Sequence, residues 1–113
     1  MSPILPIIAA LIINATPRQQ VRIYANIYGV DPALCECIVA AESDWDAGAV
    51  GALGEEGLFQ ILPTTWLFLR DKMDLPANAS AFDASENIRT GIYGLARWPR
   101  WWSTWPRCVA TMQ

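Results

Sequence analysis

The sequence Ala41-Glu42-Ser43 is followed, one glycine-rich segment later, by Gly57-Leu58-Phe59-Gln60-Ile61-Leu62-Pro63-Thr64-Thr65-Trp66. Glu42 comes at the end of an apolar helical pattern, and Pro63 begins another helix. The segment between them has a glycine at every third position from 48 to 57, which predicts an irregular loop or a small β-like excursion. Such an arrangement can hold one carboxylic acid against an apolar wall and face it with the amide of Gln60. A carboxyl group in that setting has a raised pKa and can act as a general acid.

Composition restricts the class of protein. The chain has 113 residues, of which 53% are hydrophobic and 17% charged, so one compact domain with a core is expected rather than a disordered chain. The net charge of −3 gives no reason to expect a nucleic-acid partner. The sequence contains no histidine, which excludes Ser-His-Asp and Cys-His triads and argues against a zinc site. We expect no metal or cofactor, so the chemistry must rest on carboxylates, amides, hydroxyls or thiols.

Helix start and stop signals divide most of the chain. Thr16-Pro17 and Asp31-Pro32 are typical N-terminal pairs, and Tyr28-Gly29 is a stop. The sequence from Asp83 to Glu86 resembles a capping box. The predicted helices cover residues 17–28, 32–42, 63–70 and 84–98. Strand signals are weak, so the predicted fold class is mainly α, in a single domain with a small irregular or β-like loop region.

Residues 2–13 carry no charge. A stretch of this length is too short to span a bilayer, which takes about 20 residues. Three interpretations stay open: a first core helix, an uncleaved segment that contacts a membrane or a partner, and a cleaved signal peptide. We therefore treat residues 1–15 as an apolar N-terminal segment and residues 16–113 as the folded domain.

The three cysteines are Cys35, Cys37 and Cys108. Residues two apart on a helix point in different directions, so Cys35 and Cys37 should not pair with each other. Either of them could pair with Cys108 and tie the C-terminal tail to the helix that carries Glu42. The alternative is three reduced, buried thiols.

Three motifs in one order carry a family resemblance. The first runs from Ala41 to Val50, the second from Gly57 to Pro63, and the third joins Phe82-Asp83 to Glu86-Asn87-Ile88-Arg89-Thr90-Gly91. Together they resemble the lytic transglycosylases with a soluble-transglycosylase type domain, in the lysozyme-like superfamily. The resemblance implies a lysozyme-like catalytic domain with a substrate groove beside Glu42. It also implies cleavage of the β-1,4 bond between N-acetylmuramic acid and N-acetylglucosamine in peptidoglycan.

The resemblance implies roles for particular residues. Glu42 would protonate the glycosidic oxygen and then take the proton of the sugar's own C6 hydroxyl, which closes a 1,6-anhydro ring without water. Ser43 would form a hydrogen bond near the acid, Gln60 would hold a sugar amide, and Asn87 would fix the fourth predicted helix to the active-site loop. The predicted substrate-binding residues are Ser43, Phe59, Gln60, Tyr93 and Trp98.

Two departures from the family pattern bear on the reaction. The family has a tyrosine near the acid where this chain has Gly94, and Tyr93 comes one place early. One residue is about 100° around a helix, so Tyr93 is expected to point elsewhere unless the helix is distorted. Glu55 and Glu56 precede the second motif. Either could act as a second carboxylate that positions a water and favours hydrolysis; otherwise they are solvated loop residues.

Two rival functions stay open beside transglycosylation. One is a hydrolytic muramidase on the same fold, and the other is a non-catalytic virion or envelope component. Four of the six tryptophans lie in the last sixteen residues, in a Trp-Ser-x-Trp segment similar to that of phage-encoded wall-degrading enzymes. The expected location is extracytoplasmic, in the periplasm or cell wall, or on a phage virion. The expected partner is the peptidoglycan glycan strand, with membrane or virion contact through the apolar N-terminus.

Overall fold

The structure is a computed structural model that describes residues 4–112. Within this range the helices are α1 (Ile4–Asn14), α2 (Pro17–Tyr28), α3 (Pro32–Ser43), α4 (Pro63–Lys72), α5 (Ala84–Arg97), the short 3-10 helix η1 (Pro99–Trp101) and α6 (Trp105–Thr111). Isolated β-bridges pair Glu56 with Val50 and Ile61 in the loop between α3 and α4. The mainly α prediction is therefore confirmed, and the predicted irregular loop has its small β-like part.

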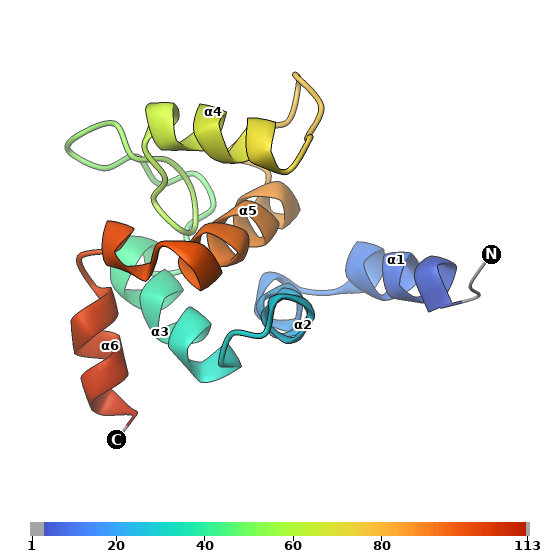
Figure 1. The fold of residues 1–113 in the computed structure, drawn as a ribbon, viewed down its shortest axis with the longest axis horizontal. Helices are drawn as coiled ribbons and strands as arrows, with labels where there is room; N and C mark the ends of the chain where they lie inside the picture. Colours follow the sequence, from blue (N-terminus) through green and yellow to red (C-terminus); the bar gives the residue numbers. More distant parts are fainter. Residues whose placement is uncertain (1–3, 113) are drawn as a thin grey trace.

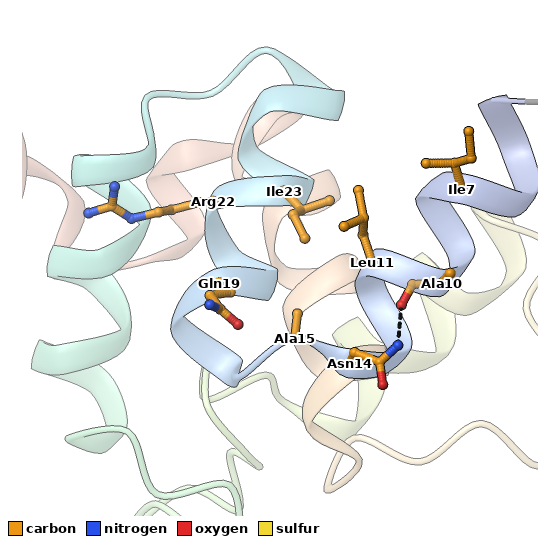
Figure 2. A pocket seen from close by; sticks show the side chains of 8 residues that line it. All are labelled: Ile7, Ala10, Leu11, Asn14, Ala15, Gln19, Arg22 and Ile23. Atoms are coloured by element: carbon orange, nitrogen blue, oxygen red, sulfur yellow. Dashed lines mark hydrogen bonds between the residues drawn. The ribbon is translucent and has the colours of Figure 1, made fainter.

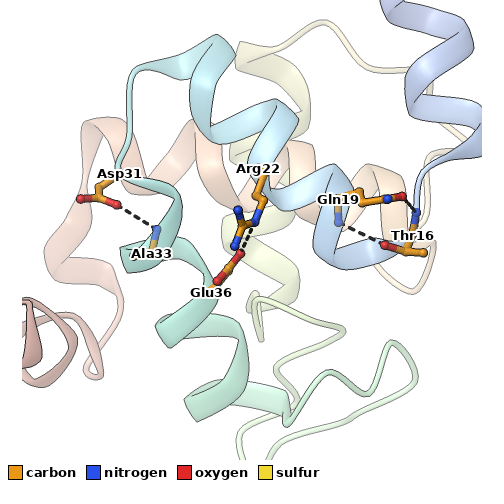
Figure 3. Close-up of polar contacts among 6 residues, drawn as sticks. All are labelled: Thr16, Gln19, Arg22, Asp31, Ala33 and Glu36. Atoms are coloured by element: carbon orange, nitrogen blue, oxygen red, sulfur yellow. Dashed lines mark hydrogen bonds and ion pairs between the residues drawn. The ribbon is translucent and has the colours of Figure 1, made fainter.

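Caps fix the ends of the helices close to the predicted positions. Thr16 and Gln19 form a reciprocal capping box at the start of α2, and Asp31 accepts a hydrogen bond from the Ala33 main-chain nitrogen at 2.8 Å (Figure 3). These bonds satisfy main-chain N–H groups that have no partner inside the helix. Gly29 ends α2 with a φ of 71°, a conformation that glycine adopts without strain.

The core lies where α2, α3 and α5 meet the Gly57–Ile61 segment. Fully buried side chains come from each of these parts: Val21, Ile38, Phe59, Ile88 and Ile92. Helix α5 runs through the middle of the molecule (Figure 1). A side chain on its Gly91 would overlap the Phe59 ring, so this glycine lets the Gly57–Ile61 segment pack closely against α5.

Helix α1 stands apart from the other helices, on the side of the molecule away from α6 (Figure 1). Ile4, Ile7, Leu11 and Ile13 are all more than half exposed, and Ile12 packs against the core. The interpretation of this segment as a core helix is thus wrong for most of its described side chains. Contact with a membrane or a virion component stays a prediction, as does the boundary between residues 1–15 and 16–113; residues 1–3 and 113 lie outside the described range.

A pocket of about 650 Å³ lies between α1 and α2. Figure 2 shows Leu11 and Ile23 facing one another across it, whereas the guanidinium of Arg22 turns away toward α3. There Arg22 Nε lies 2.8 Å from Glu36 Oε1 (Figure 3), an exposed ion pair of the kind that adds little to stability. Among the described residues, no helix has both the length and the apolar character needed to cross a membrane.

Candidate active site

Glu42 occupies the last turn of α3, one residue before the helix ends. It lines a pocket of about 210 Å³. The pocket is lined by Glu42, Leu53, Glu55, Gln60, Ile61, Leu62, Thr65, Trp101, Trp102 and Ser103. The lining therefore combines the Glu42 helix, the glycine-rich loop, the start of α4 and the tryptophan-rich tail, which are far apart in the sequence.

The carboxyl group of Glu42 is half-buried and has one side-chain hydrogen bond. Thr104 Oγ1 donates to Glu42 Oε2 at 2.8 Å. Burial raises the pKa of Glu42 above its ordinary value, and the charge of Glu55 raises it further. The Thr104 hydrogen bond and the charge of Arg107 act in the opposite direction. Because burial is the largest of these effects, Glu42 keeps its proton to higher pH than an exposed glutamate, as a general acid requires.

Three residues with positive φ lie in the chain next to Glu42 or in the pocket lining. Asp44, Trp45 and Gln60 have positive φ angles of 51°, 65° and 50°, which residues other than glycine seldom adopt. Asp44 and Trp45 turn the chain sharply after the Glu42 helix. Gln60 then makes the turn at the end of the loop, before Ile61 and α4. Strain of this kind is usually held in place by the surrounding packing and gathers at functional sites.

Gln60 ties the loop together from within. Its side-chain nitrogen donates to the main-chain oxygens of Ala49, at 3.1 Å, and Gly57, at 3.0 Å. The Gln60 oxygen lies beside Gly51, where an added side chain would come within 2.6 Å of it. The amide therefore has its nitrogen committed to the loop, and Gln60 still lines the pocket.

Asn87 connects α5 to the same loop. Its side-chain oxygen accepts from the Phe59 nitrogen at 2.8 Å. Its nitrogen donates to the main-chain oxygens of Ala81, at 2.7 Å, and Glu56, at 3.0 Å. The side chain is fully buried, so its role is to hold the loop, as the sequence predicted for it.

Sequence comparison agrees with this geometry. The family model described as the transglycosylase SLT domain matches residues 19–111. The chain belongs to the transglycosylase SLT domain family. No curated protein sequence matches it. Membership places it among the lytic transglycosylases of the lysozyme-like superfamily, and peptidoglycan cleavage is the activity of the family.

The two glutamates of the SLT-domain loop lie in different surroundings. Glu55 lines the Glu42 pocket, and its Oε1 accepts from the Leu53 nitrogen at 2.7 Å. Glu56 is outside the pocket lining, and its main chain makes the two β-bridges. Glu55 is thus the better placed of the two to serve as a second carboxylate, and the pocket lining gives no support to that role for Glu56.

Two predicted substrate-binding residues have other contacts. The Phe59 side chain is fully buried and packs edge-on against Trp102 at 6.2 Å between ring centroids, so it cannot reach a sugar. Ser43 Oγ donates to the Val39 main-chain oxygen at 3.1 Å, a bond within its own helix, and Ser43 is outside the pocket lining. Phe59 is corrected to a core residue. Ser43 has no pocket position that supports a sugar contact.

Tyr93 is outside the lining of the Glu42 pocket, in keeping with its offset from the family position. Its ring packs edge-on against Tyr28 at 5.8 Å, with the Arg97 guanidinium 3.6 Å above it. At Gly94, where the family has its tyrosine, an added side chain would come within 3.0 Å of the Trp102 ring. Trp102 therefore fills the space beside Gly94, and Tyr93 is corrected to a residue of the α2–α5 contact.

Trp98 packs against Trp101, which lines the pocket. Its ring stacks on Trp101 at 4.8 Å between centroids, and Phe68 packs edge-on against both rings. Trp101 lines the pocket and Trp98 does not, so the position of Trp98 does not support the sugar contact predicted for it. The excess of tryptophan in the tail pointed to this region without showing which ring faces the pocket.

The larger pocket between α1 and α2 lacks the chemistry of the Glu42 pocket. Its lining includes no carboxylate, and its one cation, Arg22, is paired with Glu36. The α1–α2 pocket has the larger volume, but the smaller pocket contains an acid with a raised pKa, so we take the smaller pocket as the candidate active site.

Proposed function

We propose that the chain cleaves the glycan strand of peptidoglycan at the bond between N-acetylmuramic acid and N-acetylglucosamine, with Glu42 as its single catalytic acid and base. The observation that carries this proposal is the half-buried Glu42, with a raised pKa, in a pocket of the SLT domain. The tryptophan beside it, Trp101, is 47% exposed and offers an aromatic face to a sugar ring.

The reaction follows from one carboxyl group used twice. Protonated Glu42 gives its proton to the bridging oxygen, the bond from that oxygen to the muramic acid C1 breaks, and the N-acetylglucosamine part leaves with a hydroxyl group. The C6 hydroxyl oxygen of the muramic acid then bonds to C1 and gives its proton to the Glu42 carboxylate. The products are a 1,6-anhydro end and a regenerated acid, and no water is consumed.

Hydrolysis is the second candidate, and Glu55 is the observation that favours it. A carboxylate across the pocket from the acid can remove a proton from a water that attacks C1. The negative charge of Glu55 also raises the pKa of Glu42. Against this role, one Glu55 oxygen already accepts a main-chain hydrogen bond at 2.7 Å, which ties the carboxylate to its own loop.

The test compares Glu42→Gln with Glu55→Gln on purified peptidoglycan. Glutamine has the shape of glutamate but no acidic proton, so Glu42→Gln should lower the rate by about 10²-fold or more while circular dichroism shows that the helices remain folded. A Glu42→Gln variant that clears peptidoglycan at the wild-type rate would refute the proposal. A loss of similar size in Glu55→Gln, with reducing-end products from the wild type, would favour hydrolysis instead.

We also propose that the protein acts outside the cytoplasm, in the periplasm or cell wall or from a phage virion. The disulfide between Cys37 and Cys108 supports an oxidising compartment, because such bonds seldom persist in the cytosol. Fractionation of producing cells, with the thiols alkylated before lysis, tests this. The oxidised protein should be found outside the cytoplasmic fraction, and reduced protein confined to the cytoplasm would contradict the proposal.

A further inference from the structure

Thr104 lies just before α6, and its hydroxyl group donates a hydrogen bond to Glu42. A threonine at the N-cap, the position just before a helix, often accepts a hydrogen bond from the helix's own main chain. Here the Thr104 side chain makes no such cap, and Oγ1 donates to Glu42 Oε2 at 2.8 Å, across 62 residues of sequence. Helix α6 therefore has no side-chain cap from Thr104, and Glu42 has a hydrogen-bond donor instead.

A disulfide holds the two helices that carry this contact. Cys37 and Glu42 are on α3, and Cys108 lies four residues after Thr104. Residues four apart on a helix share one face, and the Cys108 nitrogen bonds to the Thr104 oxygen at 3.0 Å. The Cys37–Cys108 disulfide, with 5.7 Å between the Cα atoms, therefore fixes the turn of α6 next to Thr104 against α3.

We propose that Thr104 is a positioning residue for Glu42 and that the Cys37–Cys108 disulfide holds it in place. The inference rests on the proposed function of Glu42. A hydroxyl that donates to Oε2 leaves Oε1 to carry the proton that goes to the glycosidic oxygen. The same bond stabilises the carboxylate while Glu42 waits to accept the C6 proton, so one donor serves both halves of the reaction.

Other charged groups act on Glu42 as well, and their effects have to be separated from that of Thr104. Glu55 raises the pKa of Glu42 from across the pocket, and Arg107, on α6, lowers it. Thr104 is the neighbour that combines a directed hydrogen bond with no charge of its own. A substitution there changes one hydrogen bond without changing the net charge of the site.

The experiment compares Thr104→Val with Thr104→Ser in the full chain. Valine keeps the shape and removes the donor, whereas serine keeps the donor. Thr111→Val is the matched control, because the Thr111 hydroxyl donates to the Cys108 main-chain oxygen on the same helix and Thr111 is not among the residues that line the pocket. We measure kcat and KM against pH on soluble glycan strands, and titrate Glu42 directly by NMR of its labelled carboxyl carbon.

Thr104→Val should raise the pKa of Glu42, move the alkaline limb of the kcat profile upward and lower kcat by about tenfold, with KM unchanged. Thr104→Ser should restore all three, and Thr111→Val should leave them as in the wild type. Removing the disulfide with Cys37→Ala and Cys108→Ala should move the Glu42 titration in the same direction. An unchanged Glu42 titration in Thr104→Val would overturn the proposal for Thr104, and an unchanged titration without the disulfide would overturn the tether.

The titration needs no turnover, so the two proposals fail separately. If Glu42→Gln stays active, the proposed function is wrong. NMR titration of Glu42 in the wild type and in Thr104→Val still shows whether Thr104 affects the Glu42 carboxyl group. If Glu42→Gln is inactive and Thr104→Val leaves the Glu42 titration and kcat untouched, Glu42 is catalytic and Thr104 is not its positioning residue.

Discussion

Trp102 donates a hydrogen bond from its indole nitrogen to the main-chain oxygen of Phe59 at 2.8 Å, across 43 residues of sequence. Both residues are buried. The bond joins the C-terminal tail to the Gly57–Pro63 motif and closes one wall of the Glu42 pocket. The C-terminal tail is thus part of the structure that forms the Glu42 pocket.

Removing this bond should destabilise the fold. Trp102→Phe keeps an aromatic ring but leaves the buried Phe59 oxygen without its donor, which costs about 1–3 kcal/mol. The smaller ring adds to that cost. Urea unfolding should show the loss, whereas Trp101→Phe, at an exposed neighbour, should unfold at nearly the wild-type concentration. Equal midpoints for Trp102→Phe and wild type would show that the bond adds nothing.

Trp101 should bind substrate rather than support the fold. Trp101→Ala removes an exposed ring beside Glu42 and should raise KM by up to about tenfold, since an aromatic contact contributes about 0.5–1.5 kcal/mol. Trp101→Phe should recover part of the loss. Michaelis–Menten kinetics on soluble glycan strands measure both variants. If Trp98→Ala raises KM and Trp101→Ala does not, we have assigned the wrong ring to the pocket.

The stability of the protein should depend on pH through Glu42. Burial raises the pKa of Glu42 in the folded state, so its contribution to the free energy of unfolding is present below the unfolded-state pKa and is lost as pH rises through the folded-state value. Glutamine does not titrate, so the free energy of unfolding of Glu42→Gln does not fall in this way as pH rises. The variant should therefore gain stability relative to wild type as pH rises above the ordinary pKa of glutamate, as measured by urea unfolding at a series of pH values. A difference that shrinks or reverses over this range would contradict a raised pKa.

Thiol reactivity should distinguish the three cysteines. Cys35 is fully buried, and burial, aided by the charges of Asp31 and Glu36, raises the pKa of its thiol to about 12. Under native conditions no thiol should react with a disulfide reagent. Denatured, unreduced protein made under oxidising conditions should show one free thiol, and reduced protein three. Three free thiols without reduction would exclude the Cys37–Cys108 bond.

The helix ends could be predicted because the determining signals are local. Thr16-Pro17, Asp31-Pro32 and Asp83 act through bonds to residues two or three positions away. A proline, Pro106, also lies in the first turn of α6, but α6 is not among the helices predicted from the sequence.

The site could be predicted only in part. Glu42 and Gln60 lie in motifs, and both line the pocket. Phe59 lies in the same motif but is buried. An apolar residue in a motif can pack in the core or contact a substrate, and the sequence alone does not distinguish the two. Thr104 meets Glu42 through the packing of α6 on α3, and no local rule in the sequence connects residues that far apart.

The central claim is that Glu42 alone performs both proton transfers, and the ends of the product strands test it most directly. Wild-type protein is incubated with purified peptidoglycan, and the released muropeptides are weighed by mass spectrometry without prior reduction. Our account predicts 1,6-anhydro ends, which are lighter than reducing ends by one water. Reducing ends as the main product of the wild-type protein would contradict it and show that a water, rather than the C6 hydroxyl, attacks the sugar.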